Sequence, residues 1–72
     1  MKKVYKLQDL DCANCAAKME AAIAKLDGVI SVRVNFMTQR LTLEADDAIF
    51  DSILQEAARL IRKVERNCTI VL

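Results

Sequence analysis

Four short segments of the chain alternate between apolar and polar residues. They read KVYKLQ, VISVRVNF, RLTLEA and CTIVL, at residues 3–8, 29–36, 40–45 and 68–72. A period of two places successive side chains on opposite faces, so each segment is predicted to form a strand. In the second segment the alternation places Ile30 on the same buried face as Val32 and Val34. Because only a short turn separates the two middle segments, they are predicted to pair as a hairpin.

Two other segments carry apolar residues at the spacing of a helix. Residues 14–26 repeat them three or four positions apart, which predicts an amphipathic helix that ends at Asp27-Gly28. Gly28, the only glycine, suits a left-handed backbone after the helix. A second helix is predicted to follow Asp46 or Asp47, either of which can cap its first turn. Its apolar stripe comprises Ile49, Phe50, Ile53, Leu54, Ala57, Leu60 and Ile61 and continues toward Val64.

The predicted order of elements is strand, helix, strand, strand, helix, strand. Two strand–helix–strand units with one-sided helices predict an α+β fold, the ferredoxin-like βαββαβ sandwich. Its four-stranded antiparallel sheet would carry both helices on one face, and residues 1–72 would form a single domain. In this topology the loop after the first strand, the hairpin turn around Met37 and the segment 63–67 meet at one end of the fold.

Composition narrows the class of protein. The formal net charge is +1, from 11 basic and 10 acidic residues that are interspersed along the chain. With only two Phe and one Tyr to stack on bases, this balance argues against nucleic-acid binding. No apolar run approaches the ~20 residues of a membrane span, and MKKVYKLQ alternates too early for a signal peptide. We therefore expect a soluble, monomeric domain that stays in the cytoplasm and does not insert into the membrane.

The residues with distinctive chemistry gather in DCANC, residues 11–15, where the first strand leads into the first helix. Unpaired backbone N–H groups and partial positive charge at a helix N-terminus favour thiolate, the species that binds metal. The spacing lets Cys12 and Cys15 turn toward one ion, and the adjacent Asp11 can add a carboxylate oxygen. Histidine is absent, so a metal site must be built from sulfur and oxygen. Three ligands leave one position open, which suits delivery of an ion rather than its retention.

Asp11 also bears on which metal is bound. Cu⁺ is a soft ion and is satisfied by two thiolates, so a hard carboxylate adds little to its binding. A borderline divalent ion gains from the extra charge, which favours Zn²⁺, with Cd²⁺ and Pb²⁺ as further candidates and Cu⁺ as the less favoured one. This ligand set does not rank the three divalent ions.

A dithiol redox protein is the main alternative, because thioredoxins also place CxxC at a helix N-terminus. Resemblance to a thioredoxin would require an aromatic residue before the first cysteine and a cis-proline facing it. This chain has Asp11 at that position and no proline. An acid beside the nucleophile would also raise the pKa of the thiol and slow its attack. A readily cycled Cys12–Cys15 disulfide would favour the redox hypothesis, whereas one tightly held ion per chain would favour metal binding.

Other residues near this end of the predicted fold have ordinary explanations. Cys68 alternates with Ile70 and Leu72, which predicts packing rather than a third sulfur ligand. Met37 is interpreted as a turn residue. The second helix ends in the basic residues Arg59, Arg62, Lys63 and Arg66. They complement the helix dipole and are interpreted as a solvated helix end, with docking of an acidic partner as the alternative.

Over essentially its whole length, the chain resembles the heavy-metal-associated domains. LDCANCAAK, residues 10–18, is similar to the LDCANCA variant in N-terminal domains of zinc-, cadmium- and lead-exporting P-type ATPases. Copper carriers and copper pumps of the family usually show GMTCxxC instead. VNF at 34–36 and IRKVERNCTIVL at 61–72 resemble the same divalent branch.

The resemblance implies Cys12 and Cys15 as the thiolate ligands and Asp11 as the acid that joins them. Asp9 stands where the family usually has glycine, and aspartate tolerates an unusual backbone angle better than most residues. The resemblance further implies a non-catalytic module that delivers ions to, or senses them for, an ATP-driven P-type ATPase. Its partner would be the membrane-embedded core of that ATPase in the same polypeptide, or the cytosolic domains of the ATPase. A stand-alone metallochaperone, with copper as an alternative cargo, would have the same sequence features.

Overall fold

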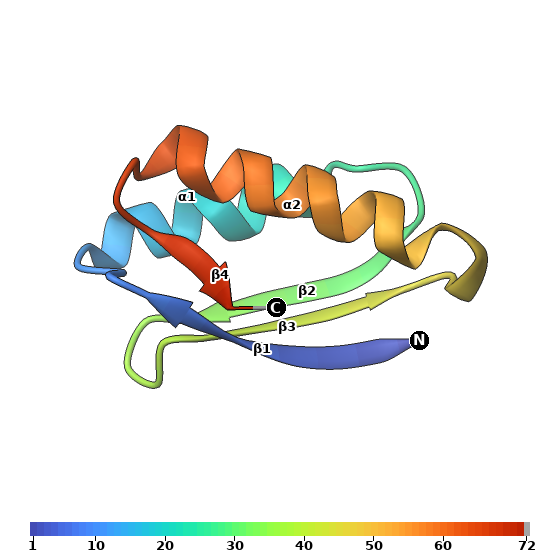
Figure 1. Ribbon diagram of the computed structural model, residues 1–72, viewed down its shortest axis with the longest axis horizontal. Coiled ribbons are helices and arrows are strands. Elements are labelled where there is room, and N and C mark those ends of the chain that lie inside the picture. Colours follow the sequence, from blue (N-terminus) through green and yellow to red (C-terminus); the bar gives the residue numbers. More distant parts are fainter. Residues whose placement is uncertain (72) are drawn as a thin grey trace.

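The computed structural model describes residues 1–71 and has the predicted order of elements (Figure 1). The strands are β1 Lys2–Gln8, β2 Val29–Asn35, β3 Arg40–Ala45 and β4 Thr69–Val71, and the helices are α1 Ala13–Ala24 and α2 Phe50–Val64. The sheet order is β2-β3-β1-β4, with every neighbouring pair antiparallel. Both helices cover the same face of the sheet. The α+β βαββαβ architecture is therefore confirmed, although Leu72 of the last predicted strand lies outside the described residues.

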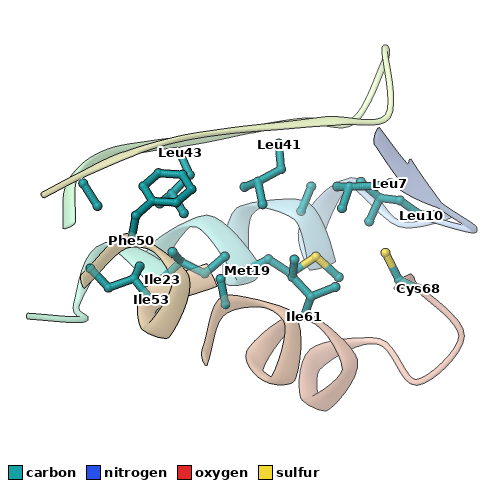
Figure 2. Close-up of a cluster of buried hydrophobic side chains, with 13 residues drawn as sticks. Leu7, Leu10, Met19, Ile23, Leu41, Leu43, Phe50, Ile53, Ile61 and Cys68 are labelled. Atoms are coloured by element: carbon teal, nitrogen blue, oxygen red, sulfur yellow. The ribbon is translucent and has the colours of Figure 1, made fainter. Parts of the chain in front are cut away.

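The core lies between the inner face of the sheet and the two helices (Figure 2). It contains Leu7, Leu10, Ala16, Met19, Ile23, Leu41, Leu43, Ala45, Phe50, Ile53, Ala57, Ile61 and Cys68. Leu41 and Leu43 of β3 are completely buried, as the alternation predicted. Truncating a buried leucine to alanine costs about 2–5 kcal/mol, so this layer supplies much of the stability of a small domain. None of the helices in residues 1–71 is both long and apolar enough to cross a membrane.

Ile30 is a correction to the predicted strand pattern. Its side chain is 66% exposed, whereas the alternation placed it in the core. The register explains the difference. Val29 pairs with Ala45, and Ser31 pairs with Glu44, the residue directly before Ala45. Between these two pairs β2 therefore contains one extra residue, Ile30, which forms a β-bulge. The bulge turns Ile30 outward, and Val29 packs against the core in its place.

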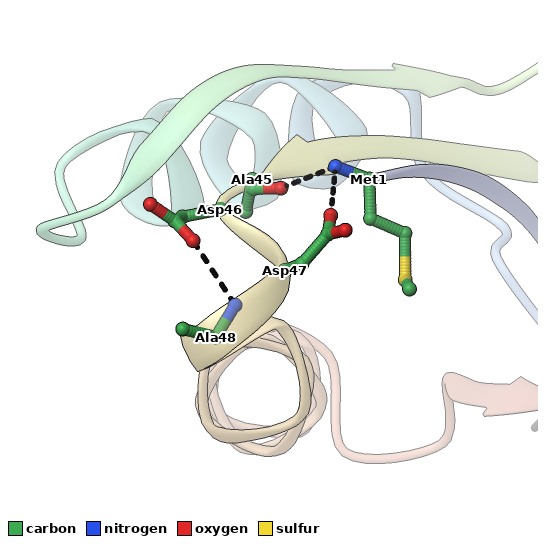
Figure 3. Close-up of polar contacts among 5 residues, drawn as sticks. All are labelled: Met1, Ala45, Asp46, Asp47 and Ala48. Carbon is green, nitrogen blue, oxygen red and sulfur yellow. Dashed lines mark hydrogen bonds and ion pairs between the residues drawn. The ribbon is translucent and has the colours of Figure 1, made fainter.

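The end of the fold opposite the cysteines is closed by backbone geometry and polar contacts (Figure 3). Gly28 has φ +95°, and a Cβ there would collide with Ile49 Cδ1, so this turn requires glycine. Of the two predicted caps, Asp46 accepts a hydrogen bond from the Ala48 backbone N–H at 3.0 Å. It caps a short 3₁₀ turn at Asp47–Ile49, and α2 begins directly after that turn.

The start of β1 is tied to this same end (Figure 3). The Met1 amino group donates to the Ala45 carbonyl at 2.8 Å and lies 2.6 Å from Asp47 Oδ1. These contacts join the start of the first strand to the end of β3 and to the 3₁₀ turn that follows it.

Candidate metal centre

The loop between β1 and α1 has a constrained backbone. Asp9 has φ +62°, the left-handed conformation for which glycine is the usual residue and which aspartate tolerates. The predicted reason for an aspartate at this position therefore agrees with its backbone geometry. Leu10, only 2% exposed, anchors the loop in the core directly before Asp11.

Gln39, in the β2–β3 turn, clamps this loop from the other side. Its Nε2 donates to the carbonyls of Leu10 at 2.6 Å and Phe36 at 3.0 Å, and its Oε1 accepts from the Leu10 N–H at 3.1 Å. Its own backbone is also left-handed, with φ +56°. The sequence pattern placed Gln39 in the short turn between the second and third strands and indicated no further role for it. The signal that could have identified it is topological, since this turn and the cysteine loop were predicted to meet.

Cys12 is the N-cap of α1, with φ −133° and ψ 118°. Its Sγ accepts a hydrogen bond from the Cys15 backbone N–H at 3.3 Å, so sulfur takes the place that a serine or aspartate oxygen usually occupies. Hydrogen bonds from the Cys15 thiol and backbone N–H lower the pKa of Cys12. The structure thus stabilises the thiolate at Cys12, as the helix N-terminus predicted.

Cys15 holds its proton more tightly than Cys12 does. The hydrogen bond with the Cys12 sulfur raises the pKa of Cys15, and desolvation acts in the same direction. The Cys15 thiol also points to a carboxylate across the fold, with Sγ 3.9 Å from Glu65 Oε2. Lys18 partly offsets these effects, since its charge lowers the pKa of Cys15.

Glu65 is a member of this site that sequence reasoning missed. It is half-buried at the C-cap of α2, where its N–H donates to the Ile61 carbonyl. Its charge raises the pKa of both Cys12 and Cys15. The segment 63–67 was predicted to reach the cysteine end, so an acid in it was a recognisable candidate.

Asp11 lies beside the cysteines in sequence but is not gathered with them in space. Its side chain is exposed and forms no hydrogen bond with either thiol. Within residues 1–71, no three side chains of His, Cys, Asp or Glu are grouped closely enough to hold a metal ion. The structure therefore brings Cys12 and Cys15 together, places Glu65 next to them, and leaves Asp11 outside the group.

The remaining candidates near this end have the ordinary positions that were predicted. Cys68 is fully buried in the core, where desolvation raises the pKa of its thiol. Met37 is 86% exposed in the hairpin turn. The end of α2 forms a wide hollow of about 940 Å³ lined chiefly by Arg59, Arg62, Lys63 and Arg66 together with Glu65.

The comparison with protein families decides what kind of domain this is. Residues 4–68 match the family described as "Heavy-metal-associated domain". The chain belongs to the heavy-metal-associated domain family. The predicted family is thereby confirmed, and with it the assignment of the chain as a metal-binding domain.

Among full-length proteins, this heavy-metal-associated domain is similar to metal-transporting ATPases. It is 41% identical over 61 residues to the zinc/cadmium/lead-transporting P-type ATPase of Escherichia coli K12, which covers 81% of this chain and 8% of that protein. It is 29% identical over 70 residues to the cadmium, zinc and cobalt-transporting ATPase of Bacillus subtilis 168, covering 97% of this chain and 10% of that protein. The chain therefore spans about a tenth or less of the length of these relatives.

Solved structures with the same fold include a domain named for copper translocation and the protein MerP. The N-terminal domain of a potential copper-translocating P-type ATPase from Bacillus subtilis has a TM-score of 0.78 at 22% identity, covering 99% of this chain and 84% of that one. Oxidized MerP from Ralstonia metallidurans CH34 has a TM-score of 0.73 at 21% identity, covering 99% and 93%. At these identities the likeness extends to the fold, which confirms the ferredoxin-like architecture.

Proposed function

We propose that this heavy-metal-associated domain binds one divalent ion, Zn²⁺ or else Cd²⁺ or Pb²⁺, through Cys12, Cys15 and a carboxylate. The observation that carries the proposal is the pair of neighbouring thiols at the start of α1, one with a lowered pKa, beside an acid. Thiolate and carboxylate together suit borderline divalent ions. The two relatives named above, at 41% and 29% identity, are named for zinc and cadmium among their ions, which supports the same choice.

Two carboxylates compete for the third ligand position. Asp11 precedes Cys12 in the chain, and rotation of its exposed side chain would bring an oxygen toward the sulfurs. Glu65 already lies 3.9 Å from the Cys15 sulfur. We assign the ligand role to Asp11, because the adjacent residue needs no movement of another element, and we leave Glu65 as a neighbouring acid outside the ligand set.

In our proposal the bound ion is cargo. Two sulfurs and one oxygen leave a coordination position at which an incoming ligand can enter before the old ligands leave. The exposed loop gives such a partner access to the ion. We propose that the domain is the N-terminal, cytoplasmic part of a heavy-metal P-type ATPase, and that it delivers ions to the membrane-embedded core or senses them for it.

Competitive metal titration under reducing conditions tests the ligand set. Asp11→Asn should weaken Zn²⁺ binding by at least about 10–100-fold, the cost of losing even a residue that only orients a metal ligand, and leave Cu⁺ binding within about twofold. Asp9→Asn is the matched control, because it removes an equal charge from the same loop with a residue that also tolerates positive φ. Equal losses for both ions, or none for either, would exclude Asp11 as the discriminating ligand.

Glu65→Gln in the same titration separates the two carboxylates. A selective loss of Zn²⁺ binding in Glu65→Gln, with Asp11→Asn unchanged, would transfer the ligand role to Glu65. Failure of the wild type to hold one ion per chain, combined with turnover of a Cys12–Cys15 disulfide by a reductant, would replace metal binding with redox chemistry.

Copper remains the second candidate cargo, because the structural neighbours include a domain named for copper translocation and a metallochaperone. A stand-alone metallochaperone would use the same two thiolates without the carboxylate. A reading frame that continues into transmembrane segments would support the ATPase proposal. A preference for Cu⁺ over Zn²⁺ as large as that of known copper-binding members of the family would support the copper carrier.

A further inference from the structure

In the part of the chain that the structure describes, one face of the sheet is left uncovered by the other elements. Both helices lie on the opposite face, and within residues 1–71 nothing packs over the outer one (Figure 1). The strand alternation identifies its side chains: Leu7 and Leu41 are buried, so Lys6 and Arg40 point away from the core. We call this surface the outer sheet face.

The outer sheet face is strongly cationic. It carries Lys2, Lys6, Arg33 and Arg40, all exposed, and a single acid, Glu44. The ion pairs of the described residues are Met1–Asp47 and Arg59–Glu56, so none of these four cations is paired. Glu44 instead accepts a hydrogen bond from the Ser31 hydroxyl at 3.3 Å. The face thus concentrates positive charge that the chain as a whole, at +1, does not have.

Two of the cations face each other. Lys6 and Arg40 are directly opposite in the antiparallel ladder of β1 and β3. Like charges in that position destabilise a sheet, so the pair does not contribute to folding. An anion located between the two side chains would turn this repulsion into attraction.

The centre of the face also offers apolar contact and a site for a phosphate. Val4 is 57% exposed and Val71 is 41% exposed, and Val71 lies opposite Lys6. A hollow of about 410 Å³ is lined by Lys2 and Arg33, with the hydroxyl-bearing Ser31 and Thr42. Cationic groups and hydroxyls are the donors that bind phosphate oxygens.

We propose that the outer sheet face docks on an anionic phospholipid surface. Lipid phosphates would lie between Lys6 and Arg40 and in the hollow, with Val4 and Val71 at the headgroup boundary. Attraction to an anionic membrane adds with each cation and needs no partner of matching shape. Docking would hold the domain beside the bilayer that its parent is proposed to cross, a consequence that rests on the proposed function.

Other occupants fit the face less well. A second copy of the chain would bring two cationic faces together, which is unfavourable. Single-stranded nucleic acid would need aromatic platforms, and Tyr5, the only tyrosine, packs toward the core. A protein partner would need a larger apolar centre than two valines provide.

Vesicle co-sedimentation at low ionic strength tests the docking. The 72-residue chain should bind vesicles of equal parts phosphatidylglycerol and phosphatidylcholine, leave pure phosphatidylcholine vesicles unbound, and dissociate as salt is raised. Each cation contributes about fivefold, so Lys6→Gln with Arg40→Gln should weaken partitioning about 25-fold. The matched control is Arg62→Gln with Lys63→Gln, which removes the same charge from α2 and should stay within about twofold.

Two results would overturn the proposal: no binding to the phosphatidylglycerol vesicles, or an equal loss in the two double variants. If the chain fails to bind the vesicles but binds polyglutamate, the partner of the face is an acidic protein. Urea unfolding of the Lys6→Gln/Arg40→Gln variant should show unchanged or higher stability, so a loss of binding is not a loss of folding. Cys12→Ser with Cys15→Ser should bind vesicles like the wild type, which separates this test from that of metal binding.

Discussion

Cysteine has different surroundings in two regions of this domain, the loop before α1 and the core. In the loop before α1, Cys12 and Cys15 are partly exposed, hydrogen-bonded to each other and close to Glu65. In the core, Cys68 is fully buried among apolar side chains. The side chain is the same, so its surroundings decide the chemistry. Backbone N–H groups at a helix start stabilise a thiolate, whereas an apolar interior keeps the thiol protonated.

The two regions are also held together differently. The core depends on apolar burial by both helices against β1 and β3. The cysteine loop depends on Leu10 and on the side-chain amide of Gln39. Because apolar burial stabilises the core whereas hydrogen bonds position the loop, stability and metal binding should respond to separate sets of substitutions.

The largest expected effect is in the core. Leu41→Ala should lower the free energy of unfolding by about 2–5 kcal/mol, because it removes a completely buried side chain and leaves a cavity. Urea denaturation measures the loss, and the folded fraction should still bind Zn²⁺ with nearly wild-type affinity. Ile30→Ala is the control, since that side chain is exposed at the bulge and should cost far less. An affinity loss as large as the stability loss would show that the regions are not independent.

Loss of the Gln39 clamp should cost less stability than Leu41→Ala but should affect both stability and metal binding. Gln39→Ala removes three hydrogen bonds to the loop and the turn, and should lower the unfolding free energy by about 1–3 kcal/mol. Unlike Leu41→Ala, it should also weaken metal binding in the folded protein, because the loop loses its fixed position. Thr38→Ala, in the same turn, leaves these bonds intact and serves as the control. Unchanged metal affinity in Gln39→Ala would mean that the ion organises the loop without help.

The smallest expected effect is a difference in reactivity among the three thiols. Cys12 has a lowered pKa and Cys15 a raised one, so Cys12 forms thiolate at a lower pH. Iodoacetamide alkylation of the metal-free, reduced protein should therefore begin at Cys12 as the pH rises, then at Cys15. Cys68 should react only on unfolding, because it is buried and its pKa is raised.

Site-resolved mass spectrometry measures this order. A Cys68→Ala variant should give the same alkylation rates at Cys12 and Cys15, because the Cys68 thiol is not hydrogen-bonded to either of them. Faster labelling of Cys15 than of Cys12 would contradict the assignment of the thiolate to the helix cap.

Local pattern was sufficient for the elements and for locating the two neighbouring thiols. Alternation identified the strands, helical spacing identified both helices, and CxxC at a strand–helix junction identified Cys12 and Cys15. It failed at Ile30, because VISV has apolar residues at both 29 and 30 and a bulge shifts the alternation by one. It also failed to foresee that the exposed Asp11 carboxylate would lie apart from the sulfurs in the folded chain.

The sequence by itself determined the fold, the family and the position of the thiols, because these depend on periodicity and on residues adjacent in the chain. Only the tertiary structure decided the surroundings of those thiols: the Gln39 clamp comes from 29 residues beyond Leu10, and Glu65 from 50 residues beyond Cys15. It also decided which cations share the bare face of the sheet, since strand register brings Lys6 opposite Arg40. Contacts between distant residues depend on how the layers pack, and packing is a property of the whole chain rather than of any local segment.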